Sequence, residues 1–174
     1  MCALCARYFV TTDDVLEHLK EAHPSATLAM FARSLQDQPC LVHNGYKYRC
    51  SHRGKDNTHS WRCTIRGCPG SARTRGSSYL DVTSVVIAAG DHNHSGSEVK
   101  TRLFCAMNKV RQLADDTNLT AQAIRQKIFA TLDPEVAAIF PSQVGIEKQV
   151  YRRRGKAKRK KCVPEHVVKD VGQE

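Results

Sequence analysis

The spacing of apolar residues changes twice along the chain, and these changes divide it into segments with different predicted structures. After Pro24, Ser25 can cap a helix. The apolar residues that follow recur at the i, i+3, i+4 and i+7 positions of one helical face: Leu28, Phe31, Ala32 and Leu35. We therefore predict a short helix or linker at residues 25–39.

Between residue 40 and about residue 97, the helical period gives way to short β-prone stretches with turn residues between them. The stretches cover residues 41–43, 46–51, 60–64, 71–74 and 82–88. The Asn44-Gly45 dipeptide separates the first two stretches, and this pair is typical of a two-residue hairpin turn. The pattern predicts a small antiparallel sheet.

A helical period returns from about residue 99 onward. The apolar residues on two successive helical faces are Leu103, Met107, Val110 and Leu113, then Ile124, Ile128 and Leu132. Pro134 and Ser142 each precede a further apolar segment and are typical helix-initiating residues. We expect three or four short helices in residues 98–151, and loose order in the last dozen residues of the chain.

Composition restricts the kind of core that these elements can build. Only 6% of the 174 residues are aromatic, which disfavours one large core and favours small modules stapled by metal. No apolar run reaches the length of a transmembrane helix, and no signal-peptide core follows Met1. We therefore expect a reducing compartment, no membrane contact, and thiolates that remain free to bind metal.

Cysteines and histidines are spaced for metal binding rather than for disulfides. The first group has the spacing C-x2-C, twelve residues and H-x4-H of a tetrahedral zinc finger: Cys2, Cys5, His18 and His23. Phe9 and Val15 occupy the two positions where such a finger needs its miniature core. Residues 1–24 therefore resemble a two-cysteine, two-histidine finger.

The helix of this finger carries the wrong charge for reading DNA. Fingers of this type read bases through helix positions −1, 3 and 6. Thr11, Asp14 and Glu17 occupy those positions here. Because carboxylates are repelled by the phosphates that line a DNA groove, we expect a structural or protein-contacting finger.

The second group of ligands has the spacing C-x4-C, twenty-three residues and H-x-H: Cys63, Cys68, His92 and His94. Residues i and i+2 of a strand point to the same side, so we expect His92 and His94 to reach one ion from a strand. Trp61 lies two residues before Cys63 and can share its inner face. We interpret Trp61 and Tyr46 as sheet core rather than as base-stacking platforms.

Taken together, the two groups predict two zinc sites. Four cysteines have no partner at ligand spacing and are interpreted as free thiols: Cys40, Cys50, Cys105 and Cys162.

Short motifs around the second group occur in register with those of a known family. They are Tyr46-Lys47-Tyr48, Trp61-Arg62-Cys63, Gly67-Cys68-Pro69 and His92-Asn93-His94. Residues 41–95 thereby resemble a FLYWCH-type zinc finger, a family similar to the DNA-binding sheets of the WRKY and GCM proteins. The helices that follow, with Pro141-Ser142 and Tyr151-Arg152-Arg153-Arg154, resemble the region after such domains in proteins related to mutator-like transposons.

The expected fold class is therefore α+β. A small zinc-stabilised antiparallel sheet of the FLYWCH/WRKY-like type is expected at residues 40–97. A ββα zinc finger precedes it and short helices follow it.

The resemblance also implies a mode of action, in which zinc holds the sheet closed and one edge enters the major groove of DNA. That groove is wide enough for a two-stranded β-ribbon. The matching region is residues 48–55, with candidate contacts at Lys47, Arg49, Arg53 and Lys55. Further candidates, for phosphates, lie on neighbouring strands: Arg62, Arg73 and Arg75. We expect Arg49, Arg53 and Lys55 to matter most.

The distribution of charge along the chain also favours DNA as the partner. The net charge is +10, and it divides into −2 for residues 1–39, +5 for 40–97, +1 for 98–151 and +6 for 152–174. The basic tail is residues 152–174, and its first ten residues include eight basic ones: Arg152, Arg153, Arg154, Lys156, Lys158, Arg159, Lys160 and Lys161. Such a run predicts nuclear localisation, a nucleic-acid clamp, or both.

These observations predict a zinc-dependent nuclear protein that binds double-stranded DNA, as a transcription regulator or a transposon-derived DNA-binding factor. We expect no enzymatic activity and no small-molecule substrate, because no set of catalytic carboxylates is recognisable. His92-Asn93-His94 is not an HNH nuclease motif, whose residues are dispersed. The alternative is an adaptor in which the finger and the helices at 98–151 bind proteins and nucleic-acid binding is non-specific. RNA binding also stays open.

Overall fold

The structure is a computed structural model that describes residues 12–23, 27–55, 57–76 and 84–161. The chain divides into two compact units, Met1–Asn108 and Lys109–Glu174. Within the described residues, no helix is both long and apolar enough to cross a membrane.

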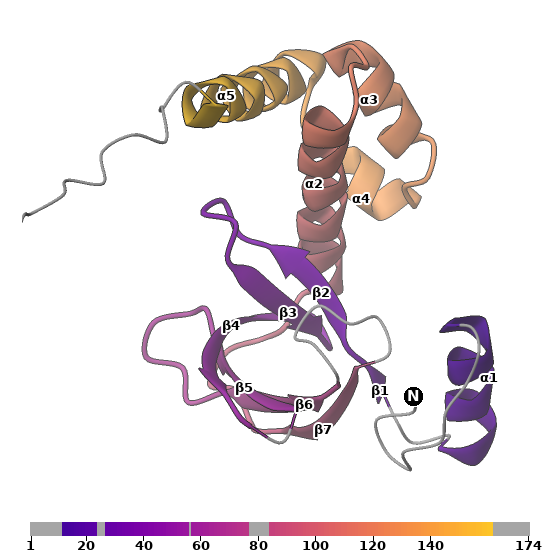
Figure 1. Cartoon of the computed structure of the whole chain (residues 1–174), viewed down its shortest axis with the longest axis vertical. Coiled ribbons are helices and arrows are strands. Elements are labelled where there is room, and N and C mark those ends of the chain that lie inside the picture. The colour runs from indigo at the N-terminus through magenta and orange to yellow at the C-terminus, as the bar shows by residue number, and fades with distance from the viewer. Residues whose placement is uncertain (1–11, 24–26, 56, 77–83, 162–174) are drawn as a thin grey trace, which may run out of the picture. The chain divides into compact units, whose positions relative to one another are not determined.

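The first unit holds helix α1 (Thr12–Ala22) and a curled antiparallel sheet (Figure 1). In the described residues the strands are β1 (Thr27–Leu28), β2 (Met30–Arg33), β3 (Pro39–His43), β4 (Tyr46–Arg53), β5 (Thr58–Cys63), β6 (Ser71–Arg75) and β7 (Val85–Ala89). Their order across the sheet is β1-β7-β6-β5-β4-β3-β2, and every neighbouring pair is antiparallel. The predicted sheet and the α+β class are confirmed.

The hairpin between β3 and β4 forms where the turn dipeptide predicts it. Asn44 and Gly45 both have positive φ, at 47° and 77°, as a primed hairpin turn requires. His43 pairs with Tyr46 on either side of them. Gly45 is also crowded, because a Cβ there would lie 2.9 Å from the backbone nitrogen of Ser97. The turn therefore needs glycine for its conformation and for space.

The predicted helix at residues 25–39 is wrong, because β1 and β2 occupy residues 27–28 and 30–33. β2 pairs with β3, with Phe31 opposite Leu41, and the Phe31 ring lies 5.5 Å from the ring of Trp61. An isolated helix this short is marginal in water. Pairing with β3 satisfies the backbone and brings Phe31 to the core, so the strand is formed and the sheet begins well before residue 40.

The core of the sheet lies around Trp61, which is fully buried. Its buried neighbours in the same cluster are Ala29, Leu41, Tyr48, Cys63 and Ala72. The indole Nε1 donates a hydrogen bond to Thr74 Oγ1 at 2.9 Å, so the ring has no unsatisfied polar atom. The interpretation of Trp61 as sheet core, on the same side as Cys63, is confirmed.

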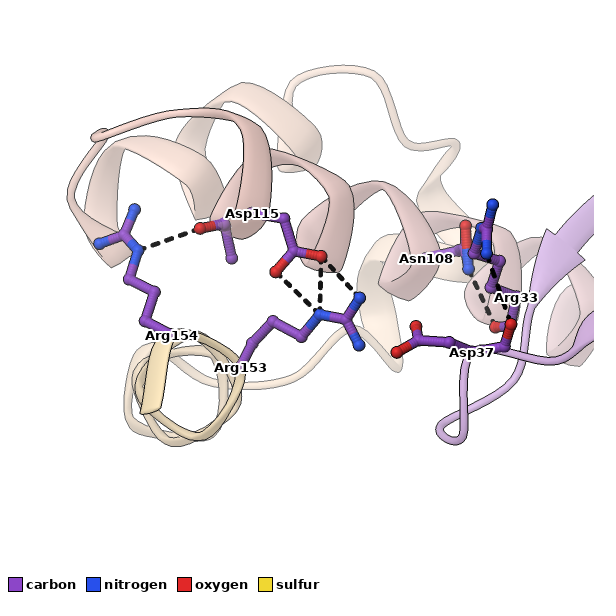
Figure 2. Close-up of polar contacts among 7 residues, drawn as sticks. Arg33, Asp37, Asn108, Asp115, Arg153 and Arg154 are labelled. Carbon is purple, nitrogen blue, oxygen red and sulfur yellow. Dashed lines mark hydrogen bonds and ion pairs between the residues drawn. The ribbon is translucent and has the colours of Figure 1, made fainter. Parts of the chain in front are cut away.

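Helix α2 (Glu98–Asp116) begins in the first unit. The backbone N–H of Lys100 donates to Ser97 Oγ, a side-chain cap at the start of the helix. Asn108, which is buried, donates from Nδ2 to the backbone oxygen of Arg33 at 2.9 Å (Figure 2). The first unit therefore includes part of the helical segment expected at 98–151.

The second unit contains three further helices: α3 (Ala121–Phe129), α4 (Pro134–Ala138) and α5 (Gln143–Lys161). Pro134 is the first residue of α4, and Ser142 Oγ accepts from the backbone N–H of Gly145 in the first turn of α5, as predicted. Buried residues from all the helices of this unit form its core: Val110, Ile124, Ile128, Val136, Ile146 and Val150. Helix α5 continues through Lys161, so the basic run expected as a tail begins as helix.

Candidate metal centre

Four ligand-type side chains meet beside the end of β5. Cys63 is the last residue of that strand, and Cys68 follows a turn in which Gly67 has φ 78°. His92 and His94 lie between the end of β7 and the start of α2. Their four donor atoms all lie within 4.8 Å of one another. The structure therefore brings together the whole of the second predicted ligand group.

The distances between these atoms fit a tetrahedral zinc ion. Cys63 Sγ lies 3.2 Å from His94 Nε2, and Cys68 Sγ lies 3.3 Å from His92 Nδ1. His92 Nδ1 and His94 Nε2 are 3.4 Å apart. Zinc bonds of about 2.3 Å to sulfur and about 2.0–2.1 Å to nitrogen place tetrahedral ligands roughly 3.3–3.8 Å from one another. Two thiolates and two imidazoles at this spacing are the donor set of a structural zinc site, and these residues fit the ion.

The two histidines do not reach the centre in the predicted way. They follow β7 in a bend rather than in a strand, so they do not share a strand face. His92 instead presents Nδ1 and His94 presents Nε2. Because these nitrogens sit at different distances from the backbone, two histidines separated by one residue can meet one ion from a bend. Both histidines reach the cluster, whereas the strand geometry predicted for them is wrong.

Backbone N–H groups prepare the two sulfurs for metal binding. Ile65 donates to Cys63 Sγ at 3.4 Å, and Gly70 donates to Cys68 Sγ at 3.3 Å. Burial raises the pKa of the Cys63 thiol. Burial would also raise the pKa of the Cys68 thiol, but hydrogen bonds from the backbone of Asn93 and Gly70 lower it overall. Because zinc takes thiolates, binding must displace protons from this pair.

Two tyrosines from β4 hold the ring of His92. Tyr46 stacks on it, with ring centroids 3.6 Å apart and planes at 6°. The hydroxyl of Tyr48 lies 2.8 Å from His92 Nε2. With Nδ1 bound to zinc, Nε2 would carry the proton and donate it to the Tyr48 oxygen. Tyr46 is therefore a packing partner of a ligand rather than an open platform for bases.

The protonation states around His92 suit a ligand. Burial, and then the neighbouring His94, lower the pKa of His92, which favours the neutral imidazole that metals bind. Burial and the nearby Cys63 thiol raise the pKa of Tyr48 to about 12, so its hydroxyl stays neutral. His94 is oriented by its other nitrogen, because Nδ1 donates to the backbone oxygen of Ser95 at 3.1 Å.

Gly70 was missed as a site residue. A Cβ at this position would collide with the imidazole of His92. The Gly-Cys-Pro-Gly string around Cys68 is the sequence signal that points to it, although which ring it clears is visible only in the fold.

The first predicted ligand group lies partly outside the described residues, because Cys2 and Cys5 are not among them. Of the other two members, His18 is on α1 and His23 follows its end, and their ring centroids are 5.2 Å apart. His23 Nε2 is buried and has no hydrogen-bond partner in the part of the chain that the structure describes. Asp14 and Glu17 are exposed on α1. The second zinc site stays a prediction.

The predicted DNA-contact residues occupy three places on the sheet. Arg49 lies directly opposite Arg62 on β4 and β5, and Arg73 on β6 is opposite Ser60. These three arginines line a depression together with Ser51, Ser60 and Ser71. All three are exposed, on the side of the sheet away from Trp61.

The remaining candidates lie elsewhere. Arg53 and Arg75 are near the β4–β5 hairpin end, paired with His59 and Thr58, and Lys55 is in its loop. Lys47 is separated from the others, since its Nζ lies 4.8 Å above the ring of Phe104 on α2. β4 is moreover not an edge strand, because β3 and β2 lie beyond it. The DNA contacts expected at residues 48–55 stay a prediction, and the structure places them on an inner strand and at its hairpin end.

The free-thiol interpretation holds for Cys40, Cys50 and Cys105, and Cys162 lies outside the described residues.

Comparison with known protein families gives a match to the sheet. The family model of the FLYWCH zinc finger domain matches residues 31–94, which run from β2 to the last of the four ligands. Neither a curated protein nor a solved structure matches the chain.

Proposed function

We propose that this protein is a zinc-dependent nuclear DNA-binding protein that regulates transcription or is a transposon-derived DNA-binding factor. Zinc holds the sheet, and the outer side and hairpin end of β4 and β5 enter the major groove. The observation that carries the proposal is the convergence of Cys63, Cys68, His92 and His94 beside strands that bear exposed arginines.

Zinc would act here as a structural cross-link. It ties the end of β5 to the segment after β7, which otherwise rests on stacking with Tyr46 and on single hydrogen bonds such as that of Tyr48. Binding of structural zinc is worth roughly 10–16 kcal/mol in small domains. The core around Trp61 is small, so this contribution decides whether the arginine-bearing strands are ordered.

Arg49, Arg62 and Arg73 suit a phosphate backbone. Guanidinium groups bind phosphate in a bidentate manner, and small serines between them leave room for a close approach. Arg53 and Lys55, at the hairpin end, are the side chains best placed to reach base edges. The net charge of +5 in residues 40–97 matches a polyanion.

The test is a selection from a random pool of DNA duplexes by the intact protein. We expect enrichment of a short motif, and loss of that enrichment in the variant Arg49→Ala/Arg53→Ala/Lys55→Ala. Lys100→Ala/Lys109→Ala/Lys127→Ala removes the same charge from exposed helical positions and serves as the matched control. If the two variants enrich the same motif equally well, the sheet is not the reading surface.

Two further regions of the chain have roles in the proposed function. Residues 152–161 would supply nuclear localisation. The first ligand group would bind a second zinc ion, for which His23 offers its buried Nε2, an atom without a hydrogen-bond partner among the described residues. The protein would act without catalysis, without a small-molecule substrate and without membrane contact.

A second candidate function is a zinc-scaffolded adaptor. It is favoured by the exposed Asp14 and Glu17 on α1, which would repel phosphate, and by Ile139 and Val144, large apolar residues exposed on the second unit. An adaptor would bind all duplexes weakly and release them at moderate salt, so the same selection would enrich no motif.

A further inference from the structure

Helix α5 has two faces with different chemistry. One face carries the buried residues Ile146 and Val150 and packs in the core of the second unit, where α3 lies against α5. Arg153 and Arg154 continue this face one turn later, at i+3 and i+4 from Val150. The basic run therefore starts on the side of the helix that faces the protein.

These two arginines bind the end of α2. Arg153 contacts both carboxylate oxygens of Asp115, with Nε at 2.8 and 2.7 Å (Figure 2). Arg154 donates from Nε to the backbone oxygen of Ala114 at 3.1 Å. Its Nη2 donates to the backbone oxygens of Thr117 and Leu119, at 3.0 and 2.7 Å. Carbonyls at a helix end lack partners within the helix, so Arg154 caps α2.

The opposite face of α5 carries two exposed cations among the described side chains. Lys148 and Arg152 are both exposed and are spaced i, i+4. The same line of the helix continues through position 155, which is Gly155. Tyr151, at the border of this line, is 82% exposed. We call Lys148, Arg152 and Gly155 the basic face.

The stability of the helix does not account for this face. Basic residues in the last turn favour the helix dipole, which explains residues 158–161. Lys148 and Arg152 lie in the middle, and like charges at i, i+4 destabilise a helix. Glycine inside a helix is also unfavourable, yet an added Cβ at Gly155 would meet nothing within 4 Å. The unit would be more stable without these residues, so a partner outside it is the better explanation.

We propose that the basic face binds the sugar-phosphate backbone of duplex DNA, as a contact surface separate from the zinc-held sheet. Lys148 and Arg152 lie about 6 Å apart along the helix axis, close enough for both to contact phosphates of one duplex. Arg153 and Arg154 hold the helix against α2, so the cations are positioned before binding and less entropy is lost. Gly155 lets a phosphate backbone approach the helix closely.

The test measures the affinity of the full-length protein for a mixed-sequence DNA duplex at several salt concentrations. Each phosphate contact contributes about 0.9 to the slope of log affinity against log salt. We expect Lys148→Gln/Arg152→Gln to reduce the slope by up to about 1.8. Lys109→Gln/Lys127→Gln removes two exposed charges of the same unit away from this face and should leave the slope unchanged. Helical ellipticity of all proteins confirms that they are folded.

Three results would overturn the proposal. One is an unchanged slope in the Lys148→Gln/Arg152→Gln protein. Another is a loss of nuclear import in that protein with DNA binding intact, which would assign the face to an import receptor. The third is a loss confined to an RNA duplex of equal length. Equal losses of affinity for the DNA duplex and the RNA duplex would support an electrostatic contact between the basic face and the phosphates.

The proposal stands apart from the function of the sheet. The Lys148→Gln/Arg152→Gln protein should lose DNA affinity by the same factor for a duplex that contains an enriched motif and for one that does not. Arg49→Ala/Arg53→Ala/Lys55→Ala should instead remove motif preference and leave the α5 contribution to the slope in place. Failure of the sheet to read DNA would therefore leave a uniform, salt-dependent affinity that still depends on Lys148 and Arg152.

Discussion

The two units of this chain are stabilised in different ways. In the sheet unit, the buried Tyr48, Trp61 and Cys63 lie next to a cluster of metal ligands, and the segment with His92 and His94 has neither strand nor helix of its own. In the helical unit, aliphatic residues such as Ile124 and Ile146 are buried, and no comparable Cys/His cluster occurs among its described residues. The candidate metal ligands and the aliphatic helical core thus lie in different units, so their contributions to stability can be tested separately.

Metal removal should give the largest difference between the units. Because Trp61 is the only tryptophan of the chain, its fluorescence reports the sheet unit alone. A strong chelator, or Cys63→Ser, should shift Trp61 emission to the red as about 10–16 kcal/mol of zinc binding is lost. Ellipticity at 222 nm, which reports mainly the helices, should change little.

The control for this experiment is readdition of zinc, which should restore the emission of the wild-type protein and not that of Cys63→Ser. Unchanged Trp61 emission after chelation would show that the sheet does not depend on the metal.

The reciprocal change acts on the helical core. Ile146→Ala removes a fully buried side chain from the second unit and should destabilise that unit by about 2–5 kcal/mol. Thermal unfolding followed at 222 nm should shift to lower temperature, while zinc content and Trp61 emission stay as in the wild type. Val144→Ala, on the same helix but 56% exposed, is the matched control and should shift little. Loss of zinc from the Ile146→Ala protein would mean that the units are coupled.

A smaller effect should come from the hydrogen bond to His92. Tyr48→Phe removes the acceptor of the His92 Nε2 proton and keeps the ring, so zinc affinity should fall by roughly 10–100-fold. Competition with a chelator of known affinity measures this. Tyr151→Phe removes a hydroxyl from an exposed ring and should leave zinc affinity unchanged. Equal affinities for the two variants would show that Tyr48 does not orient the ligand.

The mildest difference is in pH dependence. Burial lowers the pKa of His43 and of His92 below the ordinary value of 6.5, so the unfolded chain takes up these protons first. Stability of the sheet unit should therefore be fully present above about pH 6.5 and decline as the pH falls from there to the lowered pKa values. Protonation of the zinc ligands acts in the same direction.

Denaturant unfolding at pH 7.5 and 5.5, followed by Trp61 emission, measures the loss. Residues 109–161 contain no histidine, so the helical signal should change less over this interval. Equal changes in both signals would remove histidine as the cause.

Much of the fold was predictable from local chemistry. Asn44-Gly45 predicts its hairpin because few dipeptides tolerate two positive φ angles, and Pro134 and Ser142 mark helix starts through their own backbone and hydroxyl geometry. The four candidate ligands were predictable for a similar reason, because two cysteines and two histidines at close spacing are typical of a zinc site. They are Cys63, Cys68, His92 and His94.

The features that the local sequence pattern did not decide depend on contacts with residues distant in the chain. Apolar residues at 28, 31, 32 and 35 suit a helix, yet β3 offers unpaired backbone groups and the Trp61 core offers a place for Phe31, so strands form. The roles of the arginines in α5 depend on distant residues in the same way. Arg153 and Arg154 differ from Arg152 only in the helical face on which they lie, and Asp115 and the carbonyls at the end of α2 engage them. Charge and ligand type belong to the residue, whereas the atom or surface that a residue meets depends on contacts that close only when the chain has folded.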